Sequence, residues 1–202
     1  MTERLGILGG TFNPIHLGHL IIASYAADEL ELDRVLLMPA QTPPHKPDTE
    51  IIDAAHRAAM VRVAIADDPR LAFSDMDMLR AGPSYTVDLL ERVREETSCA
   101  DVFFIIGADS LRDFPSWHRP DAIIRLARLA VARRPGVVVD AAMLDALPGL
   151  RQRVALFDSP LIEISSTEIR DRAARDRSIT WLVPPAVERY IYENGLYGTS
   201  LA

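Results

Sequence analysis

The feature that most constrains the fold of this 202-residue chain is a regular alternation of short apolar runs with longer helical patterns. The apolar runs predict strands at residues 5–8, 34–38, 70–74, 102–106, 129–132 and 154–157. The helical patterns lie at residues 19–32, 51–66, 86–96 and 141–147. Strands that alternate with helices form βαβ units around a parallel sheet. The sequence therefore predicts the α/β class, with a doubly wound, Rossmann-like parallel sheet.

The pattern changes after the sixth apolar run. Ser165 and Ser166 open a short helical segment with hydroxyl side chains that can cap its N-terminus. Residues 184–193 form a second helical segment, and no repeat or low-complexity tract interrupts the chain. We therefore expect a single domain over residues 1–202, in which residues 159–202 form a small helical C-terminal subdomain.

Composition and charge disfavour several classes of protein. A net charge of −7 argues against broad nucleic-acid binding. Cys99 is the only cysteine, so an internal disulfide cannot form and a zinc cluster is excluded. The N-terminus lacks the basic start and apolar run of a signal peptide, and no stretch approaches the length of a membrane span. We expect a cytoplasmic protein that binds neither nucleic acid nor a membrane.

The first apolar run leads into a glycine-rich turn that is followed by two histidines. Gly9 and Gly10 allow backbone N–H groups to approach a ligand closely. Thr11 adds a hydroxyl group. His16 and His19 stand where the next helix begins, and a helix N-terminus carries partial positive charge. Because the glycines fit neither a Walker A loop nor GxGxxG, the sequence predicts a phosphate site of another kind.

A second candidate anion site lies in the C-terminal region. Ser165 and Ser166 offer hydroxyl groups and the N–H groups of a helix start, and Arg170 follows on the same helical face. Ser165 and Glu168 also fit a capping box, and one helix N-terminus can cap and bind an anion together. We expect the serines and Arg170 to bind the β- and γ-phosphates of a nucleoside triphosphate.

Two further polar candidates are expected at the carboxyl end of the sheet, where doubly wound proteins bind ligands. Residues 39–47 are too long and too polar for a tight turn, so they predict a loop over this edge. Lys46 in this loop is either solvated or a clamp on phosphate. Asp109 follows the fourth apolar run and can accept from ribose hydroxyls, bind a metal or cap a helix.

Four more residues could contact a planar or acidic ligand. Trp117 either packs in the core or offers a stacking face to a ring. Tyr85 and Thr86 open a helix, with Ser84 as its expected cap, and their amides could equally bind an anion. Arg134, after the fifth apolar run, is either solvated or reaches an acidic ligand. The residues alone leave these alternatives open.

The motifs of this chain resemble a known family. His16-Leu17-Gly18-His19 is the HxGH signature of the nucleotidyltransferase superfamily. The motifs that carry the closer resemblance are residues 9–19, 43–46, 83–86, 107–111, 117, 134–136 and 164–170. Together they resemble the bacterial nicotinate mononucleotide adenylyltransferase family, from near the first residue to Tyr197. Ala40, Gln41 and His118 depart from residues that are frequent in that family, at positions near the expected acceptor pocket.

The resemblance implies a nucleotidyltransferase fold and a set of roles. The reaction would join ATP and nicotinate mononucleotide into deamido-NAD and pyrophosphate. The catalytic residues would be His16, His19, Lys46 and Arg170. The ATP-binding residues would be Gly9, Gly10, Thr11, Phe12, Gly18, Asp109, Ser165 and Ser166. The acceptor would be bound by Tyr85, Thr86, Trp117 and Arg134.

The chemistry expected is a direct in-line attack without a covalent intermediate. The second pKa of a phosphomonoester is about 6, so the attacking oxygen needs no general base at neutral pH. Mg²⁺ is expected to arrive with ATP, because the sequence offers no dedicated carboxylate cluster and hence no protein metal site. The partners expected are ATP and nicotinate mononucleotide, and assembly into a homo-oligomer stays open.

Two other functions compete with this hypothesis. Another small nucleotidyltransferase, such as a phosphopantetheine adenylyltransferase, would share the first and last motifs but would not explain Trp117. A noncatalytic nucleotide-binding module would share the fold, and the intact His16, His19 and Arg170 argue against it. A tRNA synthetase is disfavoured by the short chain and its acidic charge.

Overall fold

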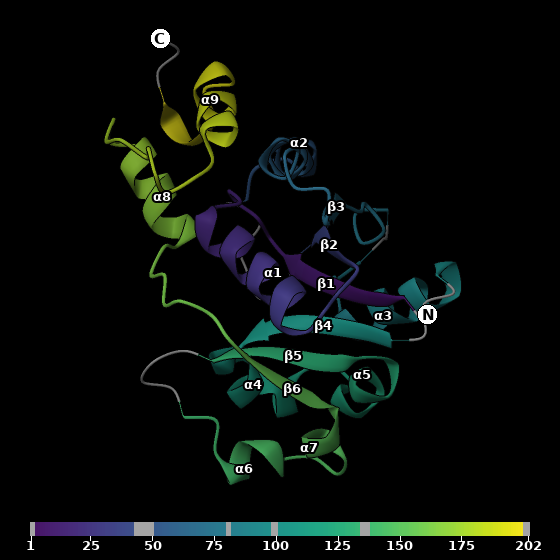
Figure 1. Cartoon of the computed structure of the whole chain (residues 1–202). Helices are drawn as coiled ribbons and strands as arrows, with labels where there is room; N and C mark the ends of the chain where they lie inside the picture. Colours follow the sequence, from purple (N-terminus) through teal and green to yellow (C-terminus); the bar gives the residue numbers. More distant parts are fainter. Residues whose placement is uncertain (1–2, 43–50, 80–81, 98–100, 134–137, 200–202) are drawn as a thin grey trace.

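The centre of the molecule is a six-stranded parallel sheet, seen in a computed structural model that describes residues 3–42, 51–79, 82–97, 101–133 and 138–199 (Figure 1). The strands are β1 (Arg4–Gly10), β2 (Arg34–Pro39), β3 (Leu71–Phe73), β4 (Asp101–Gly107), β5 (Arg128–Arg133) and β6 (Val154–Asp158). Each pairs in parallel with its neighbours, in the order β3-β2-β1-β4-β5-β6. The doubly wound parallel sheet and all six predicted strands are confirmed, with ends that differ by at most two residues.

This strand order places a topological switch at the middle of the sheet. The chain builds β1, β2 and β3 outward in one direction, then returns to place β4 on the other side of β1. In open α/β sheets the crevice at the carboxyl ends of such strands is where ligands bind. Gly9 and Gly10 end β1 and Gly107 ends β4, so the predicted phosphate turn lies at this crevice.

Helices cover both faces of the sheet. On one face lie α1 (Leu17–Glu29), α2 (Ala54–Ala64), α8 (Ser166–Ala173) and α9 (Pro185–Glu193). On the other lie α3 (Thr86–Glu96), α4 (Ala108–Asp113) and α5 (Pro120–Leu126). Shorter elements are the 3-10 turn η2 (Phe114–Ser116), α6 (Ala141–Leu144), α7 (Leu150–Arg153) and the 3-10 turn η3 (Leu196–Gly198). None of the helices in the described ranges is long and apolar enough to cross a membrane.

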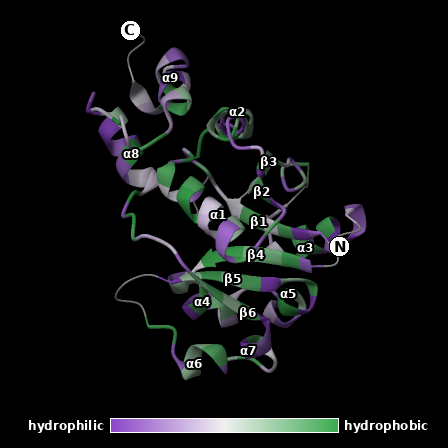
Figure 2. Cartoon of the chain, in the orientation of Figure 1, coloured by the Kyte–Doolittle hydropathy of each residue, from purple (hydrophilic) through white to green (hydrophobic). Residues whose placement is uncertain are grey.

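Successive strand residues pack alternately into two apolar cores, one on each face of the sheet. Phe103 and Ile105 of β4 join the core under α1 and α2, whereas Phe104 and Ile106 join the core under α3 and α5. The strands are therefore hydrophobic along both faces and lie between the helix layers, as Figure 2 shows. A strand buried on both sides reads as a continuous apolar run, which is why the sequence revealed these strands.

The helix predictions were less accurate than the strand predictions. The helix over residues 86–96 is confirmed as predicted, while the other three are shorter than expected at one or both ends. Helices α4, α5 and α7 were not predicted, because four to seven residues are too few to show a 3.6-residue period. Ser84 as the cap of α3 is wrong. The cap position is Tyr85, and the Ser84 Oγ instead accepts from the Thr42 N–H at 3.2 Å.

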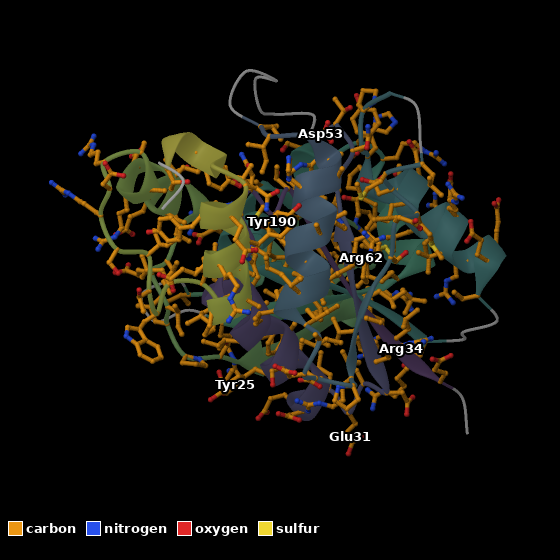
Figure 3. The ribbon with its side chains drawn as sticks, turned by 90° about the horizontal axis from the view of Figure 1, so that it is seen from above. Tyr25, Glu31, Arg34, Asp53, Arg62 and Tyr190 are labelled. Carbon is orange, nitrogen blue, oxygen red and sulfur yellow. The ribbon has the colours of Figure 1, made fainter. Side chains whose placement is uncertain are left out.

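The C-terminal helices pack on the same core as α1 and α2. Ile169 of α8 and Val187 and Ile191 of α9 are fully buried in that cluster. The His56 Nδ1 of α2 lies 2.9 Å from the Tyr190 Oη, and Figure 3 shows Tyr190 on α9 beside α2. The division of the chain into a main part and a C-terminal subdomain at residue 159 stays a prediction.

Candidate active site

A cavity of about 1040 Å³ opens at the carboxyl ends of β1 and β4. Segments far apart in the sequence meet around it: the glycine turn, the start of α1, the start of α3, the Trp117 segment and the start of α8. The predicted site residues in its lining are Gly9, Gly10, Thr11, His16, Gly18, His19, Tyr85, Thr86, Trp117, Ser165 and Ser166. The fold therefore brings most of the predicted residues to one space, large enough for a dinucleotide.

Two of the glycines lie close to aromatic rings, which would have to shift by a few tenths of an ångström to admit a Cβ. A Cβ on Gly10 would lie 3.0 Å from the Phe12 ring, and a Cβ on Gly18 would lie 3.1 Å from the His16 Nδ1. The backbone of Phe12 has a φ of 49°, a conformation that residues other than glycine rarely adopt. Its buried ring meets the His19 ring edge-on, with centroids 5.0 Å apart. The turn is thus built around aromatic packing that fixes the position of the histidines.

The two histidines form a stacked pair with distinct environments. Their ring centroids are 3.7 Å apart. His16 occupies the N-cap position of α1, and its burial lowers its pKa from 6.5 to about 4, so the ring is neutral at pH 7. The His16 backbone N–H donates to the His19 Nδ1 at 3.2 Å, which leaves the proton of a neutral His19 ring on Nε2. His19, which lines the cavity together with His16, can therefore donate a hydrogen bond from its Nε2.

The start of α8 is bonded directly to the turn that precedes α1. Ser165 caps α8, as expected, by accepting from the Glu168 N–H at 3.1 Å. The Ser166 Oγ donates to the Pro14 carbonyl at 2.9 Å, and the Arg170 Nη1 donates to the Asn13 carbonyl at 2.9 Å. Both predicted anion sites therefore belong to one structure, with the N-termini of α1 and α8 meeting at the cavity.

The aromatic end of the cavity lies near α3. Trp117 is half-buried and packs its ring on Phe114, with centroids 5.4 Å apart, while it also lines the cavity. Core packing of Trp117 is therefore confirmed, and the stacking of its ring on a ligand stays a prediction. Tyr85 stacks on His118 at 4.3 Å, and both line the cavity beside Thr86.

Several predicted residues are not part of the cavity lining or fall outside the described ranges. Among the described residues, Phe12, Asp109 and Arg170 do not appear in the lining. Asp109 forms an ion pair with Arg112 at 3.6 Å. The alternative that Asp109 caps a helix is wrong, because Gly107 holds the cap position of α4. Lys46 and Arg134 lie outside the described residues, and their roles stay predictions.

Three residues at or behind the cavity were missed. Asp77 is 3% exposed and lines the cavity. The Tyr197 Oη donates to the Asn13 Oδ1 at 2.9 Å, and burial raises the pKa of the Tyr197 hydroxyl. Arg57 is 1% exposed and donates to backbone carbonyls. A charged residue within the apolar face of α2 was the one available signal for Arg57.

Comparisons with known proteins agree with one another. The family model described as cytidylyltransferase-like matches residues 7–172. A probable nicotinate-nucleotide adenylyltransferase of Thermomicrobium roseum is 50% identical over 198 residues, which cover 98% of this chain and 92% of the relative. A protein of the same description from Synechococcus sp. (strain JA-3-3Ab) is 45% identical, with 96% of this chain and 95% of the relative covered.

A solved structure shares the fold. It is the Plasmodium falciparum nicotinic acid mononucleotide adenylyltransferase complexed with NaAD, which superposes with a TM-score of 0.80. The match covers 99% of this chain and 100% of that chain, at 20% sequence identity. At that identity the superposition shows the fold alone.

Proposed function

Since this chain belongs to the nicotinate-nucleotide adenylyltransferase family, we propose that it transfers the adenylyl group of ATP to nicotinate mononucleotide. The products are deamido-NAD and pyrophosphate. The observation that carries the proposal is the single cavity that joins the histidine turn to the aromatic group of Trp117 and Tyr85. The Plasmodium falciparum structure of the same fold holds NaAD, the dinucleotide product of this reaction.

The phosphate end of the cavity suits a triphosphate. The N-termini of α1 and α8 meet there, and each contributes partial positive charge and N–H groups. Ser165 and Ser166 add hydroxyl groups to the lining. We assign this end to ATP, with Arg170 and Lys46 as cations that act on its phosphates and Asp109 on its ribose side.

The aromatic end suits the acceptor. Trp117 offers a ring face to a pyridine ring, as aromatic pairs stack with an offset. Tyr85 and Thr86 stand at the N-terminus of α3, where partial positive charge favours a carboxylate. A carboxamide would bring N–H donors against the same groups, so we infer a preference for nicotinate over nicotinamide mononucleotide, with Arg134 as a further cation.

The reaction proceeds by attack of an acceptor phosphate oxygen on the α-phosphorus of ATP. A new P–O bond forms as the bond to pyrophosphate breaks, and the leaving group takes the electron pair. The acceptor phosphate is already ionised at neutral pH, since its second pKa is about 6. His19 donates an N–H toward the charge that develops on the transferred phosphoryl group, while His16 is held neutral by burial.

Mg²⁺ enters this proposal as part of the substrate, bound to the phosphates of ATP. Within the described ranges, no group of three or more His, Cys, Asp and Glu residues could hold a metal ion. Mg²⁺ is commonly bound through substrate phosphates with few protein ligands. We also place the protein in the cytoplasm, where ATP is available.

Product analysis tests the proposal. The protein is incubated with MgATP and, separately, with nicotinate mononucleotide, nicotinamide mononucleotide and phosphopantetheine. We expect pyrophosphate and deamido-NAD with the first acceptor, and little product with phosphopantetheine, which has no ring to stack on Trp117. Preference for phosphopantetheine would overturn the acceptor, and no pyrophosphate with any acceptor would favour a noncatalytic nucleotide-binding module.

A further inference from the structure

Arg57 is a buried cation that the proposed chemistry does not use. It lies in the first turn of α2, with 1% of its surface exposed. Its Nη1 donates to the carbonyls of Thr11 at 2.9 Å and Ala40 at 2.7 Å. Its Nη2 donates to the Gln41 carbonyl at 3.2 Å, and its Nε to the Ile52 carbonyl at 3.3 Å. Every one of these partners is a backbone carbonyl.

This arrangement is an inefficient way to stabilise a fold. Burial lowers the pKa of the Arg57 guanidinium, since the charged form loses its hydration. The charges of Asp53 and Asp77 oppose this shift, but neither carboxylate is hydrogen-bonded to Arg57 in the described part of the chain, where the bonds of its guanidinium go to carbonyls. A buried charge is commonly no more stabilising than an apolar side chain of similar size, and such charges serve geometry in some proteins. The contacts of Arg57 therefore indicate a geometric role.

The four carbonyls belong to three separate segments. Thr11 lies in the turn after β1, Ala40 and Gln41 follow β2, and Ile52 precedes α2. Thr11 and Ala40 both line the cavity, whereas Arg57 lies behind them and does not. A guanidinium is planar with donors at fixed angles, so it sets the distance between two carbonyls more narrowly than an ammonium can.

The Thr11 carbonyl has a direct consequence for the phosphate turn. In a trans peptide the carbonyl and the next N–H point in opposite directions. Within the described residues the one cis bond joins Asn13 to Pro14, so the bond after Thr11 is trans. Because Arg57 holds the Thr11 carbonyl, the Phe12 N–H points away from Arg57. Arg57 thereby fixes the direction of a backbone donor in the turn.

We propose that Arg57 is a positioning residue that holds the Thr11 turn and the Ala40–Gln41 segment in the geometry that binds the triphosphate of ATP. This proposal rests on the proposed function, since it takes ATP as the ligand of the turn. Arg57 touches neither substrate. It acts through the backbone of two segments that do line the cavity.

The test compares Arg57→Lys and Arg57→Met with the wild-type protein and with Arg70→Met, a change to an exposed arginine at the other edge of the sheet. Arg57→Lys keeps the positive charge but loses the planar guanidinium with its fixed donor angles. Arg57→Met keeps the approximate side-chain volume but loses both the charge and the hydrogen-bond donors. The measurements are the affinity for MgATP by titration calorimetry, KM for each substrate, kcat and Tm.

We expect Arg57→Lys to fold, to bind MgATP about tenfold more weakly and to raise KM for ATP by a similar factor. KM for nicotinate mononucleotide should rise by a clearly smaller factor, because Arg57 bonds the Thr11 turn directly but reaches the acceptor end only through the Ala40–Gln41 segment, whose neighbour Thr42 bonds to Ser84. Arg57→Met should likewise raise KM for ATP more than KM for nicotinate mononucleotide. Arg70→Met should match the wild-type protein in all kinetic values.

Wild-type affinity for MgATP in a folded Arg57→Lys overturns the proposal, and so does an equal rise in KM for both substrates. The affinity measurement needs no turnover, so it decides the role of Arg57 even if the wild-type protein makes no deamido-NAD. In that event the proposed reaction fails, while a loss of MgATP affinity in Arg57→Lys would still support the positioning role. If both Arg57 variants fail to fold, Arg57 is a structural residue and the proposal is wrong.

Discussion

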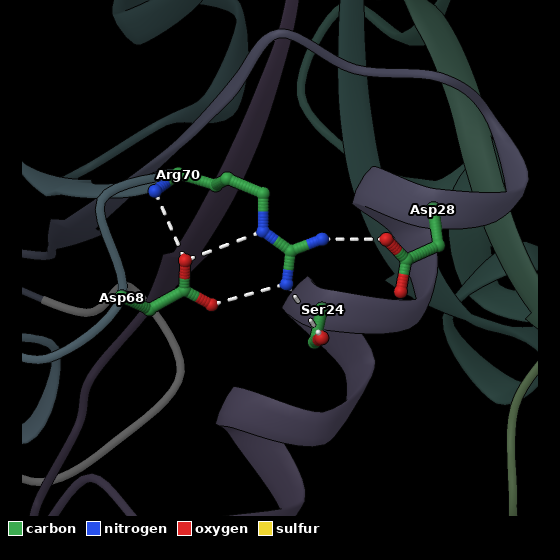
Figure 4. A network of polar contacts seen from close by, with 4 residues as sticks. All are labelled: Ser24, Asp28, Asp68 and Arg70. Carbon is green, nitrogen blue, oxygen red and sulfur yellow. Dashed lines mark hydrogen bonds and ion pairs between the residues drawn. The ribbon is translucent and has the colours of Figure 1, made fainter.

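Arg70 and Arg57, at the amino and carboxyl edges of the sheet, differ in their burial and in the groups that they bond. At the amino edge, before β3, Arg70 is exposed and pairs with the carboxylates of Asp28 and Asp68, with the Ser24 hydroxyl also in reach (Figure 4). At the carboxyl edge, Arg57 is buried and binds backbone carbonyls alone among the described residues. Exposed ion pairs contribute little to stability, whereas a buried charge constrains whatever it bonds.

The difference extends to the surroundings of each arginine. At the amino edge, ion pairs between partly exposed side chains join the elements, such as Arg70 with Asp28 and Arg4 with Glu31. At the carboxyl edge the carbonyls of Thr11, Asn13 and Pro14 each accept a hydrogen bond from a distant side chain. The turn after β1 is therefore held by distant side chains in addition to its own aromatic packing. The hydrogen bonds that fix the backbone geometry of this turn thus lie beside the cavity.

The largest expected effect is on turnover at the carboxyl edge. In the proposed mechanism His19 donates an N–H to the transferred phosphoryl group, so His19→Ala should lower kcat by roughly a hundredfold or more. Tm and the affinity for MgATP should stay close to wild-type values. Steady-state kinetics and calorimetry check this, with Arg70→Met as the control at the other edge. A near-wild-type kcat would contradict the role given to His19 and weaken the contrast between the edges.

The next effect is on stability at acid pH. Burial lowers the pKa of His16 to about 4 in the folded protein, below its ordinary 6.5, so the unfolded chain binds the proton more readily. The stabilisation is complete above pH 6.5 and is lost as pH falls toward 4. Between pH 7.5 and 4.5 the wild-type protein should lose about 2 to 3 kcal/mol more unfolding free energy than His16→Asn. Urea titrations of both proteins at the two pH values measure the difference, and equal losses would show that His16 is not buried as described.

A smaller effect is expected at the aromatic end of the cavity. In the proposed function the pyridine ring stacks on Trp117, so Trp117→Ala should raise KM about tenfold for both nicotinate and nicotinamide mononucleotide. The ratio of kcat/KM between the two acceptors should stay within about twofold, because Trp117 makes the same contact with each ring. If the ratio of kcat/KM instead fell close to one, Trp117 would be the residue that distinguishes the two acceptors. Phe114→Leu, behind the ring, is the matched packing control.

The contrast between the edges also explains what the sequence could predict. The strands were found because both faces are buried, so each is a continuous apolar run. His16 and His19 were found because their partners are local: a strand, two glycines and a helix start. Arg57 and Tyr197 could not be found in this way, since their partners lie 46 and 184 positions away. Moreover, the Arg57 partner is a backbone carbonyl, which carries no side-chain signature.

The smallest effect is expected at the amino edge and sets the scale for the others. Arg70→Met removes two exposed ion pairs, in which the Arg70 side chain is 40% exposed, so the unfolding free energy should fall by less than about 1 kcal/mol. The hydrogen bond from Arg70 lowers the pKa of the Asp68 carboxyl, so this stabilisation exists above the ordinary pKa of Asp68 and is lost as pH falls through the lowered value. Added salt should shrink the difference between wild-type and variant further, because exposed charges are screened. Urea titrations at neutral pH in low and high salt measure it. A loss above about 2 kcal/mol, or any change in KM for ATP, would mean that the amino edge is coupled to the cavity and that the two arginines differ less than their surroundings indicate.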